Sequence, residues 1–121
     1  MPYIIFIVDD DVSLVEILKL AFESQGFKVV SAHDGRIAMN MLKDLVPDLM
    51  IVDLTMPGMD GWRFTMKVRQ DHRFAKTPII VCSGLLEEEK PAQAHESANV
   101  YIPKPFEIME LISKVKQFLH V

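Results

Sequence analysis

The stretch YIIFIVDDD, residues 3–11, decides the fold: an apolar run closes in three consecutive carboxylates. An uninterrupted apolar run is typical of a strand buried on both faces, as in a parallel sheet covered by helices. Carboxylates held a few ångströms apart repel by roughly 1 to 4 kcal/mol per pair, so we expect a cation among Asp9, Asp10 and a partner acid. Asp11 has a simpler explanation, because it precedes a helical pattern where Asp is a common N-cap.

Length and composition indicate one globular domain over residues 1–121. Half of the residues are apolar and a quarter are charged, which is ordinary for a folded domain with a single core. No stretch approaches the roughly 20 apolar residues of a membrane span, and no signal peptide is recognisable, so a cytoplasmic protein without membrane contact is expected. The net charge is −4 without a basic cluster, which argues against direct nucleic-acid binding.

Five short apolar runs alternate with helical patterns, which is typical of an α/β fold with a doubly wound parallel sheet and helices on both faces. The expected strands cover residues 3–8, 28–32, 49–52, 78–82 and 100–102. Cys82 lies in the fourth of these runs, where a buried and inert thiol is expected.

Five helices are expected between and after these strands. The first contains Ile17 and ends near Gly26, a plausible C′ residue; the others cover about 37–45, the surroundings of Phe64 and Val68, 86–98 and 106–119. The helical pattern is weakest in the segment 86–98, because this segment has few large apolar residues and carries a proline in its body. Ile37 belongs to the apolar pattern of the second helix. Four methionines also lie in apolar patterns and are expected to fill the core, namely Met39, Met41, Met50 and Met109.

Polar residues follow four of the five expected strands: Asp9-Asp10, Asp53, Ser83-Gly84 and Lys104. The carboxyl ends of parallel strands meet at one edge of a sheet, and ligands of open α/β sheets bind there. Oxygen ligands of this kind favour Mg²⁺, Mn²⁺ or Ca²⁺. The sequence therefore predicts a divalent-cation site with a lysine beside it.

At these positions the chain resembles the receiver domains of two-component response regulators, the chemotaxis-type flavodoxin-like modules. Four motifs carry the resemblance: the acids of Val8-Asp9-Asp10-Asp11, the segment VDLTMPGMDG at 52–61, Ser83 with Gly84, and Lys104-Pro105-Phe106. It extends over nearly the whole chain and implies a five-stranded sheet in the order 2-1-3-4-5 with five helices on two faces.

The resemblance also implies roles for the acids. Asp53 would be the nucleophile that takes a phosphoryl group from a phosphohistidine. Asp10 and Asp53 would bind Mg²⁺ (or Mn²⁺ in its place) directly, together with the main-chain carbonyl of Thr55, while Asp9 would act mainly through a coordinated water. Such a module is a signalling component rather than an enzyme, and catalyses only its own phosphorylation and slow dephosphorylation.

Further roles follow from the same resemblance. Lys104 would neutralise charge on the transferred phosphoryl group. Ser83 would donate its hydroxyl to a phosphoryl oxygen, Gly84 would leave room for the phosphate or water, and Tyr101 would swing inward on activation. The loop 56–61 is expected to use its glycines for positive φ angles and to hold the Thr55 carbonyl toward the metal.

The implied partners are a sensor histidine kinase or a histidine phosphotransfer protein, and a downstream protein target or an output domain. The segment 85–99 and Pro103 depart from the family pattern on the face where most receivers meet partners, so partner identity and a phosphorylation-dependent dimer stay open. The sequence stops at Val121, and both a stand-alone receiver and a piece of a longer regulator are compatible with it.

Three other kinds of protein share parts of this pattern. A dehalogenase-type hydrolase normally has a second Asp two residues after its nucleophile, where this chain has Thr55. A flavin carrier needs a phosphate-binding loop after the first strand, where three carboxylates would repel a phosphate. A phosphorylation-independent interaction module usually lacks one of the acids or the lysine, all of which this chain has. His33, His72, His95 and His120 show no metal-binding spacing and are expected at the surface.

Overall fold

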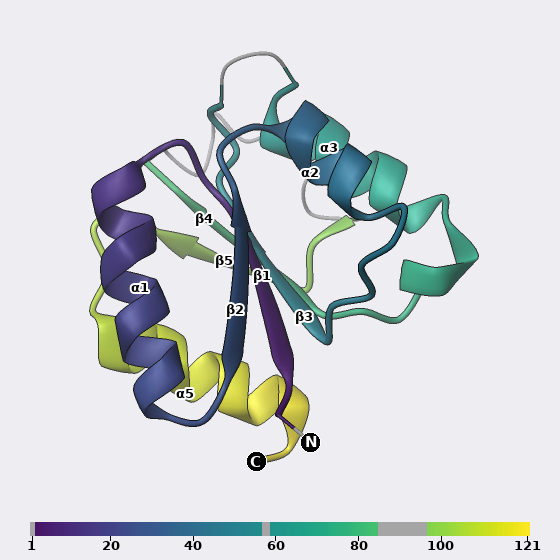
Figure 1. Ribbon diagram of the computed structural model, residues 1–121. Coiled ribbons are helices and arrows are strands. Elements are labelled where there is room, and N and C mark those ends of the chain that lie inside the picture. The colour runs from purple at the N-terminus through teal and green to yellow at the C-terminus, as the bar shows by residue number, and fades with distance from the viewer. Residues whose placement is uncertain (1, 57–58, 85–96) are drawn as a thin grey trace.

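The computed structural model describes residues 2–56, 59–84 and 97–121. Five parallel strands form one sheet in the order β2-β1-β3-β4-β5 (Figure 1). They are β1 (Ile4–Val8), β2 (Lys28–Ala32), β3 (Leu49–Val52), β4 (Ile79–Ser83) and β5 (Val100–Pro103). The parallel sheet and its strand order confirm the sequence prediction, and the strand boundaries differ from it by no more than one residue.

Helices cover both faces of the sheet (Figure 1). α1 (Val12–Ser24) and α5 (Ile108–Leu119) lie on one face, and α2 (Gly35–Met41) and α3 (Gly61–Arg69) lie on the other, with a short 3-10 turn, η1 (His72–Phe74), after α3. The helix expected over 86–98 lies outside the described residues except for Ser97 and Ala98. None of the helices that the structure describes is long and apolar enough to cross a membrane.

Alternation along each strand divides the core into two halves. In β1, Ile5 and Ile7 pack with α1 and α5, while Phe6 and Val8 pack with α2 and α3. Because successive side chains of a strand point to opposite faces, a wholly apolar strand is needed to fill both halves. This is why β1, residues 4–8, contains no polar residue.

Aspartates set the beginnings of three helices. Asp11 accepts a hydrogen bond from the Leu14 backbone N–H at 3.1 Å, and Asp34 and Asp60 do the same at the starts of α2 and α3. A side-chain oxygen at this position satisfies a backbone donor that the helix leaves unpaired. The expected N-cap role of Asp11 is confirmed, as is Gly26 beyond the end of α1, where φ is +90°.

Met109 does not fill the core as expected, and Ile17 and Ile37, which fit the apolar helical patterns, are exposed as well. Ile17, Ile37 and Met109 are 50%, 48% and 68% exposed, respectively. Each lies on a helix that contacts the sheet along one side only, so the outer edge of a wide apolar stripe stays in solvent. Helix α2 also ends at Met41 rather than near residue 45.

Candidate functional site

The backbone of two neighbouring strands brings Asp9 and Asp53 to the same edge. Val8 and Val52 are register partners at the ends of β1 and β3. The ladder continues one residue further, because the Asp9 N–H donates to Ala32 O at 3.1 Å and the Asp53 N–H donates to Val8 O at 2.9 Å. Both aspartates are 4% exposed, so the sheet itself fixes where their carboxylates begin.

Asp10 joins these two residues in an acid cluster. One carboxylate oxygen from each of Asp9, Asp10 and Asp53 lies within 4.8 Å of the others. Asp10 is exposed, and Asp9 Oδ1 accepts the Asp11 backbone N–H at 2.9 Å. Three closely spaced carboxylates in a partly open position form a donor set that fits a hard divalent cation such as Mg²⁺.

Among the described residues, Lys104 is the one that brings a positive charge next to the acid cluster. Its Nζ is 2.8 Å from Asp9 Oδ2 and 3.6 Å from Asp53 Oδ2, and its side chain is 22% exposed. The backbone N–H of Lys104 donates to Ser83 O at 2.8 Å, which ties the residue to the end of β4. One ammonium among three carboxylates leaves excess negative charge, so the cluster retains an attraction for a cation.

The titration of the site reflects this crowding. Burial raises the pKa of Asp53, and the charges of Asp9 and Asp10 raise it further, while Lys104 and the Thr55 backbone N–H oppose the shift. Burial would lower the pKa of Lys104, but its hydrogen bond to Asp9 and the charges of Asp53 and Asp9 outweigh this and raise it. The raised pKa keeps the Lys104 ammonium charged at neutral pH.

Gly61 packs directly against the backbone of Asp53. A methyl group on Gly61 would overlap the Asp53 carbonyl oxygen and would lie 2.7 Å from both the Asp53 carbonyl carbon and Leu54 Cα. The Gly61 N–H also donates to Leu54 O at 2.9 Å. The expectation that this glycine supplies a positive φ is wrong, because Gly26 is the glycine with positive φ among the described residues; Gly61 is needed for close approach.

Thr55 contacts the carboxylate of Asp53. Its backbone N–H and its hydroxyl lie 3.3 and 3.4 Å from Asp53 Oδ1. These long hydrogen bonds orient one carboxylate oxygen and leave Oδ2 on the side of Lys104. The predicted use of the Thr55 carbonyl as a metal ligand remains a prediction.

Ser83 and Tyr101 contact each other beside Lys104, where β4 and β5 lie next to each other. Ser83 is fully buried at the end of β4, and its carbonyl accepts both the Lys104 N–H and, at 3.2 Å, the Tyr101 hydroxyl. Gly84 is exposed, and a Cβ added to it would meet no atom of the described residues within 4 Å. The structure thus places all the predicted site residues around one edge of the sheet, with open space at Gly84.

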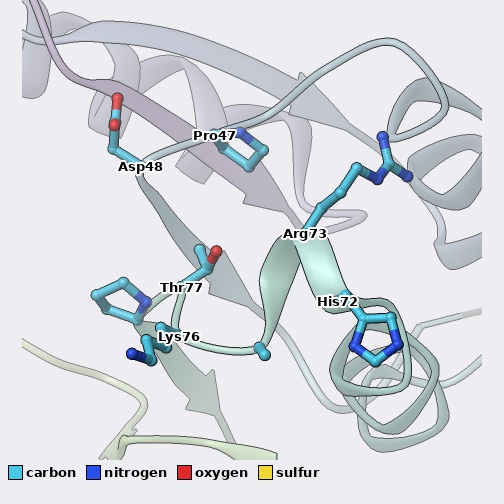
Figure 2. Close-up of a pocket in the computed structure, with 8 residues that line it drawn as sticks. Pro47, Asp48, His72, Arg73, Lys76 and Thr77 are labelled. Carbon is cyan, nitrogen blue, oxygen red and sulfur yellow. The ribbon is translucent and has the colours of Figure 1, made fainter.

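A separate cavity lies at the opposite edge, at the amino ends of β3 and β4 (Figure 2). Its volume is about 440 Å³, and its lining includes Asp48, Arg73 and Lys76. Asp48 accepts the Ile4 backbone N–H at 2.7 Å, and Arg73 is paired with Asp71 at 2.8 Å. Within the described ranges, the group of three acidic, histidine or cysteine side chains that are close enough to hold a metal is the acid cluster, which lies outside this cavity.

Comparison with known proteins agrees with this arrangement. Residues 5–116 match the response regulator receiver domain family. The transcriptional regulatory protein CpxR of Escherichia coli is 35% identical over 116 residues, which cover 95% of this chain and 48% of CpxR. The chain spans about half the length of the curated relatives it matches.

Solved structures show the same fold. A putative response regulator from Chloroflexus aurantiacus superposes with a TM-score of 0.91 at 33% identity, covering 100% of both chains. The response regulator TrrA of Thermotoga maritima, solved in complex with Mg²⁺-BeF, gives a TM-score of 0.85 at 27% identity, covering 98% of this chain and 99% of TrrA. With the family match, the strand order and the acids at the strand ends in agreement, the chain belongs to the response regulator receiver domains of two-component systems.

Proposed function

We propose that the chain, working as one domain over residues 1–121, is an active phosphoacceptor that takes a phosphoryl group onto Asp53. The observation that carries the proposal is the acid cluster of Asp9, Asp10 and Asp53 with the Lys104 ammonium 2.8 Å from Asp9 and 3.6 Å from Asp53. A purely structural role would gain little from three adjacent carboxylates, because their mutual repulsion is destabilising.

In the proposed reaction, an Asp53 carboxylate oxygen attacks the phosphorus of a phosphohistidine on the donor. The new O–P bond forms as the P–N bond breaks, and its electron pair stays with the imidazole nitrogen. Phosphoryl transfer needs mainly positioning and charge neutralisation from the protein. Mg²⁺, when bound to the acids and the Thr55 carbonyl, would supply charge neutralisation on the transferred oxygens.

The chain's own residues divide the remaining tasks. Thr55 and Gly61 orient Asp53 by hydrogen bonding and by backbone packing, and Lys104 faces the oxygen on the other side. Ser83 would donate to a phosphoryl oxygen after transfer, and Tyr101 would respond to that change. A hydrogen bond that exists only in the phosphorylated state is able to bias an equilibrium between two conformations.

The proposed partners follow from this chemistry. The donor would be a sensor histidine kinase or a histidine phosphotransfer protein, and the output would pass to a downstream protein or to a linked domain. TrrA, a relative at 27% identity, is described with Mg²⁺-BeF, which supports Mg²⁺ as the proposed cofactor. A phosphorylation-independent interaction module of the same fold is the alternative.

Intact-mass measurement after incubation with acetyl phosphate and Mg²⁺ tests the proposal. We expect a single phosphoryl adduct on the wild type that disappears in Asp53→Asn and in the presence of a chelator. Asp60→Asn is the matched control, since it removes a nearby carboxylate but keeps a good helix N-cap. Absence of an adduct on the folded wild type would contradict the proposal and favour the phosphorylation-independent alternative.

A further inference from the structure

Arg69, the last residue of α3, makes an unusual set of contacts. Its Nε donates to Ser97 O at 2.9 Å, its Nη1 donates to Phe74 O at 2.8 Å and Thr77 O at 2.7 Å, and its Nη2 donates to Asn99 Oδ1 at 2.8 Å. All four acceptors are neutral, and within the described residues no carboxylate lies within ion-pair distance of Arg69.

A basic residue at a helix C-terminus commonly interacts only with the helix dipole and water. The Arg69 guanidinium instead spans two chain segments, the connection that leads into β4 and the connection that leads into β5. Burial lowers its pKa, as expected for a charge that gives up some hydration. The planar fork of a guanidinium allows one side chain to bind acceptors in several directions at once.

The segment 97–99 is held from two sides. Thr65, one turn before Arg69 on α3, shares a hydrogen bond of 2.7 Å between its hydroxyl and that of Ser97, and both residues are buried. On the side of the sheet, Asn99 Oδ1 accepts the Ile79 N–H at 2.8 Å, and the Asn99 N–H donates to Ile79 O at 2.8 Å. We name this arrangement of Thr65, Arg69, Ser97 and Asn99 the α3 clamp.

The clamp sits at the amino end of β5, which is an edge strand of four residues paired with β4 alone. At its other end, β5 is fixed by the Lys104 N–H bond to Ser83 O. Tyr101 lies between these two anchors, two residues after Asn99. An edge strand this short has few ladder bonds of its own, so its position depends strongly on what holds its ends.

The other end of α3 reaches the phosphoacceptor. Gly61, the first residue of this helix, packs against the Asp53 backbone. A single helix of nine residues therefore contacts Asp53 at its start and the beginning of β5 at its end. Such a rigid element links two sites physically, although coupling between them has to be measured.

We propose that Arg69 is a positioning residue whose guanidinium fixes the amino end of β5 and thereby holds the Tyr101 hydroxyl against the Ser83 carbonyl. Without it, Asn99 keeps its two bonds to Ile79 but loses its tie to α3, so the amino end of β5 is held from one side and Tyr101 is held less firmly. The placement of Tyr101 stands independently of phosphorylation, while its consequence for switching rests on the proposed function.

The test is Arg69→Lys, which keeps the charge but replaces the fork by one ammonium that cannot serve acceptors on both segments. The matched control is Arg63→Lys on the same helix, where the side chain is 66% exposed and 3.9 Å from Asp60. Hydrogen exchange is followed at the Asn99 amide and, as internal references, at the amides of Asp9 and Asp53, which bond to neighbouring strands.

We expect Asn99 protection to fall by about tenfold or more in Arg69→Lys, the size of one or two lost hydrogen bonds, while Asp9 and Asp53 change by less than about twofold. Tyr101 is followed by fluorine NMR with fluorotyrosine in a Tyr3→Phe background, which leaves one tyrosine. Its resonance should move or broaden in Arg69→Lys and stay unchanged in Arg63→Lys. Equal loss of protection at all three amides, or an unchanged Tyr101 resonance, would overturn the proposal.

Two additions keep the test decisive. Thr65→Val removes the hydroxyl contact to Ser97 and leaves Arg69 in place. It should move the Tyr101 resonance in the same direction as Arg69→Lys but by a smaller amount, and it keeps the test available if Arg69→Lys fails to fold. An unmoved resonance in Thr65→Val would count against the clamp. Adding Mg²⁺ and beryllofluoride then tests switching: the wild-type Tyr101 resonance should shift, and the shift should fall to about half in Arg69→Lys. A wild-type resonance that does not respond to beryllofluoride would contradict the proposed function. The measurements without beryllofluoride would still decide whether Arg69 positions Tyr101.

Discussion

At the scale of single residues, Asp53 combines burial with like-charged neighbours. A carboxyl whose pKa is raised by folding destabilises the native state above that pKa, and this cost disappears below the usual aspartate range. Asp53→Asn should therefore increase the free energy of unfolding by about 1 to 3 kcal/mol at pH 7 without Mg²⁺. The gain should shrink as the pH falls through the raised pKa. Urea unfolding at several pH values measures it, and a gain that grows toward acid pH would contradict the assignment.

Gly61 shows how one missing side chain supports the site. Gly61→Ala would push a methyl group into the Asp53–Leu54 backbone, and overpacking of this kind typically costs about 1 to 3 kcal/mol. We expect that loss in urea unfolding, together with weaker Mg²⁺ binding followed by Trp62 fluorescence. The stability control is Gly84→Ala, where the added methyl meets nothing within 4 Å in the described part of the chain. A change above about 0.5 kcal/mol there would show that the comparison is not specific.

At the scale of elements, the caps decide where helices begin. Asp60 accepts the Arg63 N–H at 3.1 Å at the start of α3, so Asp60→Ala should lower the free energy of unfolding by about 1 kcal/mol and Asp60→Asn by a few tenths at most. Thermal unfolding of both variants measures this difference. Equal losses in the two variants would mean that the charge, rather than the hydrogen bond, matters at this position.

Periodicity located the strands well because their burial on both faces leaves an uninterrupted apolar run. It was less reliable for helices: Ile17, Ile37 and Met109 fit the stripe but lie outside the contact with the sheet. Close approach and clamping could not be predicted in this way. The neighbours of Gly61 and Arg69 are brought together only by the folded chain, and a basic residue ending a helix gives no signal beyond the ordinary dipole interaction.

At the scale of the whole molecule, the acids and lysine of the site could be predicted because a parallel sheet collects its strand ends at one edge. The same arrangement should couple metal binding to global stability, since a ligand that binds only the native state stabilises it by mass action. Mg²⁺ at about ten times its Kd should add about 1.4 kcal/mol to the wild type. Asp10→Asn should lose most of this gain in thermal unfolding at matched ionic strength, and an unchanged gain would remove Asp10 from the metal ligands.

Cys82 is 1% exposed on β4, and burial raises the pKa of its thiol to about 12. The thiolate is the nucleophile that attacks an alkylating reagent, so both the burial and the raised pKa of Cys82 should make the native protein almost inert toward such reagents. Because this is the chain's one cysteine, the rate at which iodoacetamide modifies it reports how often the sheet around β4 opens to solvent. The molecule thus carries its own probe of rare opening events, readable by mass under native conditions and without an engineered cysteine.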